Sequence, residues 1–311
     1  MDKVKEYYNS EYVSQSALKL LIGRPLDFVE RPVVDSDSVL LGSFVDKLLT
    51  DDNPRYSVCR SIAPPKVKQI FNFMFDNEDI RFKELRDIEN YILDACKVFN
   101  FFPYYKDPTR VGKVREHEHY WRAMQEANGR LVLSEEMYNT GIRVAESIRQ
   151  TKYFADLKDH CTYQYPVFFE IEGEKCKALI DVLYFNDDDK HITVADIKTT
   201  SSSLKDFDNS INKYRYDIQA AFYVDAVRDK FKDYSVSFEF IVQNTNDVFN
   251  PLCIEVDEAF LDRGRNGAFG YKGYLQLLDD LKWYREHGFQ NHRDLSTVGK
   301  ITCTNGKIHF L

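Results

Sequence analysis

The sequence lacks any run of about eighteen consecutive apolar residues, the shortest stretch that suggests a membrane-spanning helix. Its first segment, MDKVKEYYNSEY, also lacks the apolar core of a secretory signal. We therefore expect neither a membrane span nor export, and a cytoplasmic location follows as the default expectation.

Closely spaced cysteine pairs are missing as well. The chain contains no C-x-x-C pair, and no histidine accompanies a cysteine at the spacing of a metal site. Structural zinc sites and iron–sulfur clusters need such groups, so both are disfavoured. Reduced thiols packed in the core are expected at Cys59, Cys96, Cys161, Cys176, Cys253 and Cys303.

Positive charge is in short supply. Lys and Arg number 42 against 50 Asp and Glu, which gives a formal net charge of -8 at pH 7. This balance argues against a protein that coats nucleic acid without specificity, because such binding depends on neutralising phosphates. It leaves room for an enzyme that admits DNA through a local basic channel. Aromatic residues reach 14%, which indicates large core residues first and base-stacking platforms second.

The first half of the chain is predicted to be helical. Residues 1–55 contain a helix that Ser14 or Ser16 caps, and a second helix that begins near Leu40. Polar residues and prolines predict a loop over 51–66, and residues 67–125 are again mostly helical. Ser134 marks the start of a further helix, LSEEMYNTGIRVAESIRQ.

The pattern changes near residue 161, where three short runs rich in β-forming residues follow one another: YQYPVFFEI, CKALIDVLYF and HITVADIKT. A helix, two more strands and a last helix over roughly 257–286 complete the order. These elements predict an α/β core with a helical N-terminal half.

One domain over 1–311 is the preferred organisation, since no repeat or linker is evident. Within it, 1–155 is mainly helical, 156–260 is the α/β core, and 261–311 holds a helix and a hairpin. The hairpin is predicted from Asn305-Gly306 between β-like runs.

Asp-x-Lys triplets recur along the chain, and only their context separates them. Four are Asp156–Lys158, Asp188–Lys190, Asp196–Lys198 and Asp280–Lys282. The first and last lie in helix-like surroundings, where side chains two apart point to different faces. The second lies in a polar turn. Asp196 ends an apolar strand, so Lys198 follows it on the same face.

A second carboxylate, Asp181, emerges from the preceding apolar run CKALID. A hairpin can bring Asp181 and Asp196 side by side, where two carboxylates repel each other and lose hydration. A divalent cation would relieve both problems, and oxygen ligands favour Mg²⁺ or Mn²⁺. From Asp181, Asp196 and Lys198 alone, a metal site and a hairpin with ordinary surface charges are equally good interpretations.

The segment DIKTTSSSLKDFDNSINKYRYDIQAAFYVDAV resembles the RecE-like (exonuclease VIII) branch of the PD-(D/E)XK nucleases, which are relatives of lambda exonuclease and RecB-type nuclease domains. In that branch a D-x-K-T-T strand precedes a helix with Q-x-x-x-Y, here Gln219 and Tyr223, which share a helix face. The likeness covers most of residues 14–228. It implies a restriction-endonuclease-like α/β fold, with a mixed central sheet flanked by helices.

The resemblance also implies roles for the strand residues. Asp181 and Asp196 would ligate the metal together with the backbone carbonyl of Ile197, and Lys198 would be the catalytic lysine. The metal would be Mg²⁺ or Mn²⁺.

Other roles implied by the resemblance concern the helices. Gln219 and Tyr223 would brace the site or contact the DNA backbone. Ser16, Lys19 and Arg24 would lie near the phosphate of a DNA end, although helix capping and a solvated surface explain these three equally well.

The chain departs from the family pattern at two positions. The second helix usually carries a His in G-x-x-x-H, whereas GSFVD places Asp46 there. Asp46 can still ligate Mg²⁺, or it is an ordinary surface acid. The acidic residue expected on the first strand is Glu170, with Gln164 as a competing position that binds metal less well. The number of metal ions is therefore open.

The resemblance implies a DNA exonuclease that digests duplex ends, with 5′→3′ polarity, in phage or prophage recombination or repair. A single-strand annealing protein would be its partner, and a homo-oligomeric ring is expected. The alternatives are an endonuclease or single-strand nuclease on the same fold, or an inert module that binds DNA or protein.

Two further patterns carry less chemistry. His117 and His119 are two apart, so they diverge on a helix and cannot clamp one metal ion. Gly264, Gly267, Gly270 and Gly273 recur every third residue without a preceding strand or a phosphate-loop lysine, so we interpret them as helix-packing positions or helix breaks.

Overall fold

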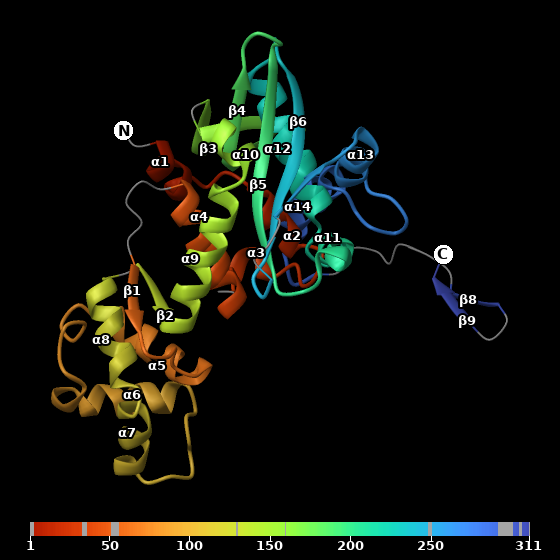
Figure 1. The fold of residues 1–311 in the computed structure, drawn as a ribbon. Coiled ribbons are helices and arrows are strands. Elements are labelled where there is room, and N and C mark those ends of the chain that lie inside the picture. The colour runs from red at the N-terminus through yellow and green to blue at the C-terminus, as the bar shows by residue number, and fades with distance from the viewer. Residues whose placement is uncertain are drawn as a thin grey trace. The chain divides into compact units, whose positions relative to one another are not determined.

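The structure is a computed structural model that describes residues 3–32, 36–50, 56–128, 130–158, 160–247, 251–291, 301–304 and 307–310. The chain divides into two compact units (Figure 1). The core unit combines Met1–Val33 with Glu146–Leu311, and the inserted unit is Val34–Ala145. The expectation of one domain over 1–311 stays a prediction.

A five-stranded mixed sheet is the centre of the core unit, with the strand order β3-β4-β5-β6-β7. Strands β3, β4 and β5 form an antiparallel meander, β6 runs parallel to β5, and β7 is antiparallel to β6. The strands are β3 (Cys161–Ile171), β4 (Glu174–Asn186), β5 (His191–Thr200), β6 (Ser235–Asn244) and β7 (Leu252–Glu255). The predicted α/β fold with a mixed sheet flanked by helices is confirmed.

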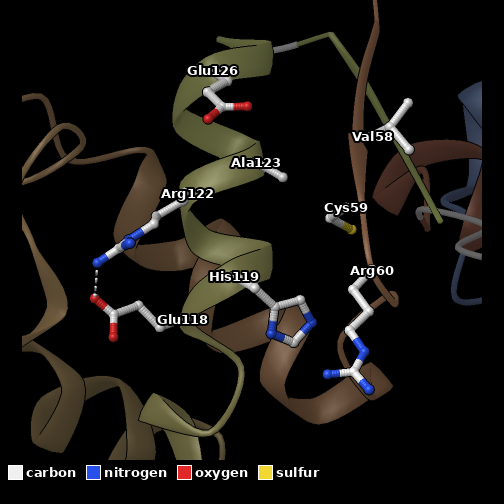
Figure 2. A pocket seen from close by; sticks show the side chains of 8 residues that line it. All are labelled: Val58, Cys59, Arg60, Glu118, His119, Arg122, Ala123 and Glu126. Atoms are coloured by element: carbon white, nitrogen blue, oxygen red, sulfur yellow. Dashed lines mark hydrogen bonds and ion pairs between the residues drawn. The ribbon is translucent and has the colours of Figure 1, made fainter. Parts of the chain in front are cut away.

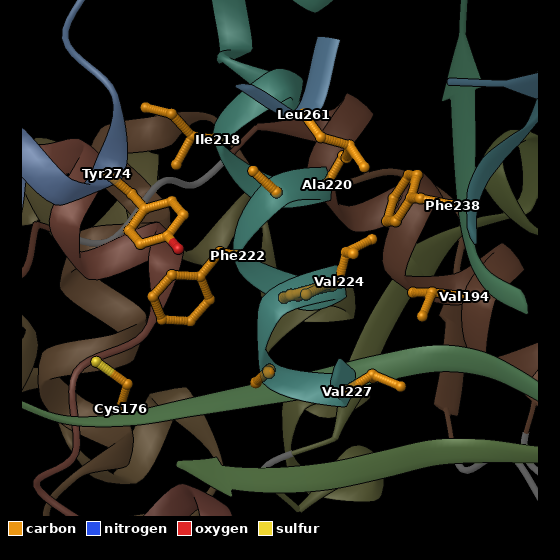
Figure 3. Packing of buried hydrophobic residues seen from close by; sticks show 14 of the residues in the cluster. Cys176, Val194, Ile218, Ala220, Phe222, Val224, Val227, Phe238, Leu261 and Tyr274 are labelled. Carbon is orange, nitrogen blue, oxygen red and sulfur yellow. The ribbon is translucent and has the colours of Figure 1, made fainter. Parts of the chain in front are cut away.

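Helix α12 (Tyr216–Lys230) packs against this sheet because small and large apolar residues cover almost its whole circumference. Phe222 of α12 packs edge-on against Phe169 of β3, with ring centroids 5.0 Å apart. Figure 3 shows the same helix between strand residues such as Val194 and residues of later helices such as Tyr274. This packing orients α12, so that one face of the helix is directed at the sheet.

The remaining helices of the core unit are short or lie late in the chain: α1 (Lys3–Asn9), α2 (Gln15–Leu20), α3 (Asp27–Glu30), α10 (Lys152–Lys158), η2 (Leu204–Asp206), α11 (Phe207–Tyr214), α13 (Glu258–Asn266) and α14 (Tyr274–His287). The helix predicted over 257–286 is therefore two helices. Gly267, Gly270 and Gly273 lie in the break between them, and Gly264 is a packing position in α13.

The inserted unit is mainly helical and has its own apolar core. It contains α4 (Asp37–Thr50), β1 (Tyr56–Cys59), α5 (Pro65–Phe75), η1 (Leu85–Asp87), α6 (Glu89–Val98), α7 (Asp107–Arg115), α8 (Glu118–Ala127), β2 (Leu131–Ser134) and most of α9 (Glu135–Arg149). The loop expected over 51–66 is wrong in part, because β1 pairs in parallel with β2. A four-residue strand of this kind is too short to give a periodic signal.

Two helix starts can be compared with the sequence. Ser14, rather than Ser16, caps α2, since its hydroxyl accepts a hydrogen bond from the Ala17 amide at 3.3 Å. The Ser134 hydroxyl accepts from the Met137 amide at 3.1 Å at the start of α9, as its position predicts.

The predicted C-terminal hairpin corresponds to β8 (Ile301–Thr304) and β9 (Lys307–Phe310), which pair antiparallel. Its turn residues Asn305-Gly306 lie outside the described residues. Cys59, Cys96, Cys176 and Cys253 are free thiols, although Cys253 is exposed rather than in the core. Within the part of the chain that the structure describes, no helix has the length and apolar character to cross a membrane.

Candidate active site

Asp196 and Lys198 lie together at the end of β5. Strand periodicity places both on one face, and their side chains form an ion pair there. The Asp196 side chain is buried, at 2% exposure, and that of Lys198 is largely buried, at 16%. A buried carboxylate needs such a partner, because an isolated charge out of water is strongly destabilising.

Gln219 holds the other oxygen of Asp196. Its amide Nε2 donates to Asp196 Oδ1 at 2.7 Å from the first turn of α12. The Asp196 carboxylate is therefore fixed from two sides, by the helix and by Lys198.

Asp181 comes to the same place from β4. Its Oδ2 accepts a hydrogen bond from the backbone amide of Ile197 at 3.3 Å, directly after Asp196. Pairing between β4 and β5 stops at Val182 and Ala195, so the two carboxylates lie where the strands separate. The backbone N–H and C=O of a strand residue point to the same side, so the Ile197 carbonyl also faces β4.

A local irregularity of the sheet turns Asp181 toward α12. The β3–β4 register passes from Tyr163–Val182 to Tyr165–Ile180, and between them Gln164 has a positive φ of 47°. Along β4, the even-numbered residues up to Ile180 face the core, and beyond this point Leu183 faces it instead. A non-glycine residue held at positive φ is uncommon, and such residues cluster at active sites and ligand clamps.

Gln164 is the β3 residue that lies beside Asp181. Its Nε2 is 3.5 Å from Asp181 Oδ1. Glu170, the expected acidic ligand of this strand, is exposed and pairs with Lys175 near the β3–β4 turn. Six residues along a strand correspond to about 20 Å, so Glu170 does not join the site. The expectation for Glu170 is wrong, because the register, which the sequence alone does not fix, places Gln164 there.

Tyr223 lies one helical turn after Gln219 on the same face of α12. Burial and the negative charges of Asp181 and Asp196 raise the pKa of Tyr223 well above its ordinary value. Its hydroxyl is therefore a neutral donor beside the two carboxylates.

Lys198 keeps its positive charge in this setting. Burial alone lowers the pKa of Lys198, but Asp196 and Asp181 raise it more strongly, so its pKa lies above the ordinary value. The site therefore holds two carboxylates and one ammonium group.

The N-terminal residues divide in their relation to the site. Lys19 approaches it: its Nζ donates to the Tyr214 carbonyl at 3.0 Å, and burial and the charge of Lys198 lower the pKa of Lys19 to about 8. Arg24 instead forms ion pairs with Asp27 and Glu30. Ser16 is exposed, and its hydroxyl lies 2.9 Å from that of Ser14.

Sequence reasoning did not single out Tyr216 and Tyr7. The Lys198 ammonium lies 4.9 Å from the centre of the Tyr216 ring. Tyr216 precedes Gln219 by three residues on α12, and that helical spacing was a usable signal. Burial, Tyr8 and Asp181 raise the pKa of Tyr7 to about 12. Tyr7 is distant in sequence, and no local pattern marks it.

Asp46 lies on α4 of the inserted unit and is partly buried. Its role as a metal ligand stays a prediction. Across the described residues as a whole, no group of three or more His, Cys, Asp or Glu side chains is arranged to hold a metal ion.

The donors at the β4–β5 site nevertheless fit a hard divalent ion. Mg²⁺ is often held by one or two carboxylates, with water and substrate phosphate completing its coordination. Asp181, Asp196 and the Ile197 carbonyl provide such a set. A thiol-ligated metal does not fit, since all of these donors are oxygen atoms.

A pocket of about 390 Å³ in the inserted unit contains His119, Arg60 and Arg122 (Figure 2). The His119 Nε2 lies 3.1 Å from the Ser61 hydroxyl and 3.0 Å from the Ser61 carbonyl. Arg122 is paired with Glu118 and Glu84. His119 and Arg122 therefore already have partners within the protein.

A mixed sheet whose strand ends carry two acids and a lysine defines the PD-(D/E)XK class of protein. The chain belongs to the family described as a PDDEXK-like domain of unknown function, whose model matches residues 85–286. The superfamily predicted from the D-x-K-T-T and Q-x-x-x-Y segments is confirmed, and this membership supports a nuclease.

Solved structures show more distant likenesses. A protein from Eubacterium rectale that is provisionally described as an exonuclease is 15% identical, with a TM-score of 0.49, over 92% of this chain and 87% of that chain. The structure of SSO0001 is 13% identical, with a TM-score of 0.28, over 81% and 86% respectively. No curated protein matches the chain.

Proposed function

We propose that this protein is a metal-dependent nuclease that hydrolyses phosphodiester bonds of DNA at the β4–β5 site. The observation that carries the proposal is the convergence of Asp181, Asp196 and Lys198, with Gln219 fixing the Asp196 carboxylate. Family membership supports the same chemistry.

Each side chain has a distinct part in the proposed reaction. Asp181, Asp196 and the Ile197 carbonyl would hold Mg²⁺ or Mn²⁺, which when bound lowers the pKa of water and neutralises charge on phosphate. Lys198, an ammonium group beside both acids, would hydrogen-bond the phosphate and stabilise the negative charge that develops on it. Gln219 would keep Asp196 oriented throughout.

The resemblance to RecE-like enzymes supports a finer proposal. The protein would digest linear duplex from its ends in the 5′→3′ direction and leave a single strand for an annealing protein, in phage or prophage recombination. A homo-oligomer that surrounds DNA would fit this role. Light scattering tests the last point, because a monomer has a mass of 36.6 kDa.

An inert DNA-binding or interaction module remains the second candidate. It is favoured by Asp46, which stands where the second helix of the family usually carries a His. Calorimetric titration with Mn²⁺ separates the two candidates. A nuclease binds the ion, and Asp181→Asn weakens that binding. If the protein is an inert module, neither the wild type nor Asp181→Asn shows saturable Mn²⁺ binding.

The test of the proposed function is digestion of linear duplex DNA in Mg²⁺, labelled at the 5′ end in one sample and at the 3′ end in the other. Early release of the 5′ label as short products, with closed circular duplex left intact, supports the 5′→3′ exonuclease. Cleavage of the circle indicates an endonuclease. No cleavage of either DNA contradicts the proposal.

A further inference from the structure

The connection between α13 and α14, residues 267–273, carries a phenylalanine that points into solvent. Phe269 is 90% exposed and has a positive φ of 51°, which is uncommon for a bulky residue. Gly270 follows with φ 81°, and Ala268 and Tyr271 exchange backbone hydrogen bonds of 3.0 and 2.9 Å. Phe269 therefore stands at the tip of a tight turn.

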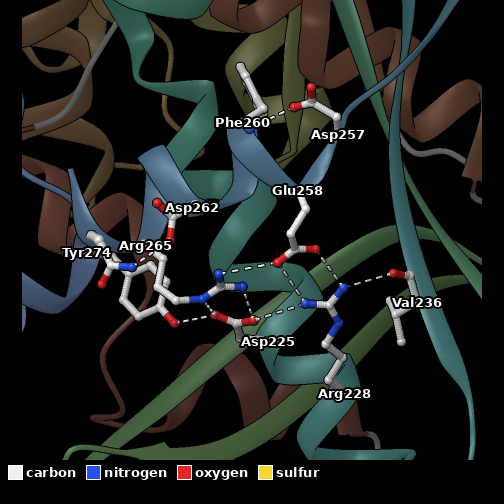
Figure 4. Close-up of polar contacts among 10 residues, drawn as sticks. Asp225, Arg228, Val236, Asp257, Glu258, Phe260, Asp262, Arg265 and Tyr274 are labelled. Carbon is white, nitrogen blue, oxygen red and sulfur yellow. Dashed lines mark hydrogen bonds and ion pairs between the residues drawn. The ribbon is translucent and has the colours of Figure 1, made fainter. Parts of the chain in front are cut away.

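Both ends of this loop are fixed to the same residue of α12 (Figure 4). Asp225 accepts two hydrogen bonds of 2.7 Å from Arg265, just before the loop, and one from the Tyr274 hydroxyl just after it. The loop ends also approach so closely that a Cβ at Gly273 would lie 2.3 Å from the Arg265 carbonyl. The base of the loop is thus ordered before any partner arrives.

A second anchor connects the loop to the start of α12. Arg215 donates to the Lys272 carbonyl at 2.7 Å and pairs through two hydrogen bonds with Asp217. The guanidinium groups of Arg215 and Arg263 lie 5.2 and 5.5 Å from the centre of the Tyr271 ring. Tyr271 is held on these two cations and remains 48% exposed.

The same segment leads directly to the active site. Arg215 is followed by Tyr216, whose ring contacts the Lys198 ammonium, and Tyr216 stacks on Tyr214 with centroids 5.7 Å apart. Tyr214 is 48% exposed and carries Lys213 over its ring at 4.9 Å. Exposed rings interleaved with cations thus connect the candidate active site with the loop.

This composition fits a nucleic-acid strand better than a protein surface. Aromatic rings stack on bases of any sequence, and an exposed cation such as Lys213 attracts phosphates. Arg215 and Arg263 pair with Asp217 and mainly hold Tyr271 in place. A base inside a duplex already stacks on its neighbours, so an isolated ring at a loop tip is best matched by an unpaired or terminal base. A preordered loop also loses little entropy on binding.

We propose that the 267–273 loop is a base-stacking element, in which Phe269 stacks on an unpaired base of the DNA strand whose phosphate lies at the active site. The inference rests on the proposed nuclease function. It assigns Phe269 a positioning role, since the residue touches the strand and not the reacting phosphate.

The test compares Phe269→Asn with Phe269→Trp. Asn accepts the positive φ and removes the ring, whereas Trp keeps a ring. The probe is a linear duplex with a short single-stranded overhang that carries 2-aminopurine, whose fluorescence reports stacking, measured in EDTA so that no cleavage occurs. Phe269→Asn should bind this probe about tenfold more weakly than the wild type and lose the fluorescence change. Phe269→Trp should retain both.

Several outcomes would overturn the inference. Equal binding and equal fluorescence for Phe269→Asn and the wild type would show that the ring contacts no base. A fall in native mass without a change in DNA binding would assign the loop to self-association. The unfolding midpoint should stay unchanged, because the ring is in solvent.

The same measurements separate this inference from the proposed function. A wild-type protein that cleaves in Mg²⁺ while Phe269→Asn binds normally leaves the nuclease standing and removes the stacking role. If instead the wild type never cleaves DNA but Phe269→Asn weakens DNA binding, the stacking role stands and the proposed nuclease activity is removed.

Discussion

Gln219 acts on the candidate site through the hydrogen bond that it donates to Asp196, so it is a positioning residue. Substitution Gln219→Ala removes the donor to a buried carboxylate oxygen that no water replaces easily. Partners that orient metal ligands typically contribute 10- to 100-fold in affinity or activity. We expect a loss of about that size.

The measurement is hydrolysis rate against Mg²⁺ concentration. Gln219→Ala should raise the concentration that gives half-maximal rate, whereas Gln150→Ala, at an exposed position just after α9, should leave the curve unchanged. An unaltered Mg²⁺ dependence for Gln219→Ala would show that Asp196 needs no such support.

Glu239 of β6 is a buried acid outside the site. Burial raises the pKa of Glu239, the hydrogen bond from the Cys253 thiol at 3.1 Å lowers it, and Glu255 raises it further. Because its pKa in the folded state is above that in the unfolded state, folding favours the protonated acid. Its destabilising effect is absent below about pH 4.5 and grows as pH rises to the folded-state pKa.

Glu239→Gln should therefore gain stability relative to the wild type as pH increases from 4 to 8, by on the order of 1 kcal/mol. Urea unfolding at several pH values measures the difference. Glu170→Gln makes the same chemical change at an exposed position of β3, which β4 and β5 separate from β6, and serves as the control. A pH-independent difference for Glu239→Gln would contradict the burial argument.

The residues of the site were predictable where they lie close together in sequence on one strand or one helix. Asp196 and Lys198 follow from the strand period of two, and Gln219 and Tyr223 from one helical turn. The choice between Glu170 and Gln164 was not predictable, because it depends on the β3–β4 register. Register is a tertiary property that a single strand does not encode.

Among the elements, α12 and α13 depend on a glycine for their close approach. A Cβ at Gly264 would lie 1.9 Å from the Asp217 carbonyl oxygen, which is backbone and cannot move aside. Gly264→Ala should therefore destabilise the protein by about 3 kcal/mol. Thermal and urea unfolding measure the loss.

Gly112→Ala is the matched control, since nothing lies within 4 Å of its added Cβ in α7. Alanine is the better helix former, so this variant should gain about 0.5–1 kcal/mol. Equal effects of the two substitutions would contradict the packing described for α13.

Element boundaries followed from sequence where the signals were strong. The meander and the helix start at Ser134 match the structure, but the helix expected over 257–286 is interrupted at 267–273. Apolar residues recur at helical spacing both before and after the glycines, so hydrophobic periodicity alone did not reveal the turn. The close approach of Gly267 and Gly273 that makes this break is a tertiary contact.

At the scale of the whole molecule, the sequence predicted the α/β class and the superfamily. It did not reveal that Val34–Ala145 forms a compact unit of its own, inserted between two stretches of the core unit. The inserted unit has a separate apolar core, and its strands β1 and β2 pair in parallel although they are far apart in sequence. Contacts between residues so far apart in sequence leave no periodic pattern.

The formal charge of -8 makes local basic groups important for any DNA complex. Basic groups lie around the candidate site and the adjoining aromatic residues, namely Lys198, Lys19, Lys213, Arg215 and Arg263. Asp217 pairs with the two arginines. An acidic protein with a local basic region can still bind DNA there, and its affinity should decrease as salt increases.

The most direct measurement is Mg²⁺-dependent hydrolysis of end-labelled linear duplex by the wild type, Lys198→Ala and Lys190→Ala. Both lysines belong to Asp-x-Lys triplets, but Lys190 is exposed in the β4–β5 turn. Wild type and Lys190→Ala should cleave equally, while Lys198→Ala should lose at least about a hundredfold in rate. Lys198→Ala should unfold at a lower midpoint, because Asp196 loses its partner, but it should still fold cooperatively at the assay temperature. Cleavage by Lys198→Ala at the wild-type rate would contradict a catalytic centre at Asp181, Asp196 and Lys198.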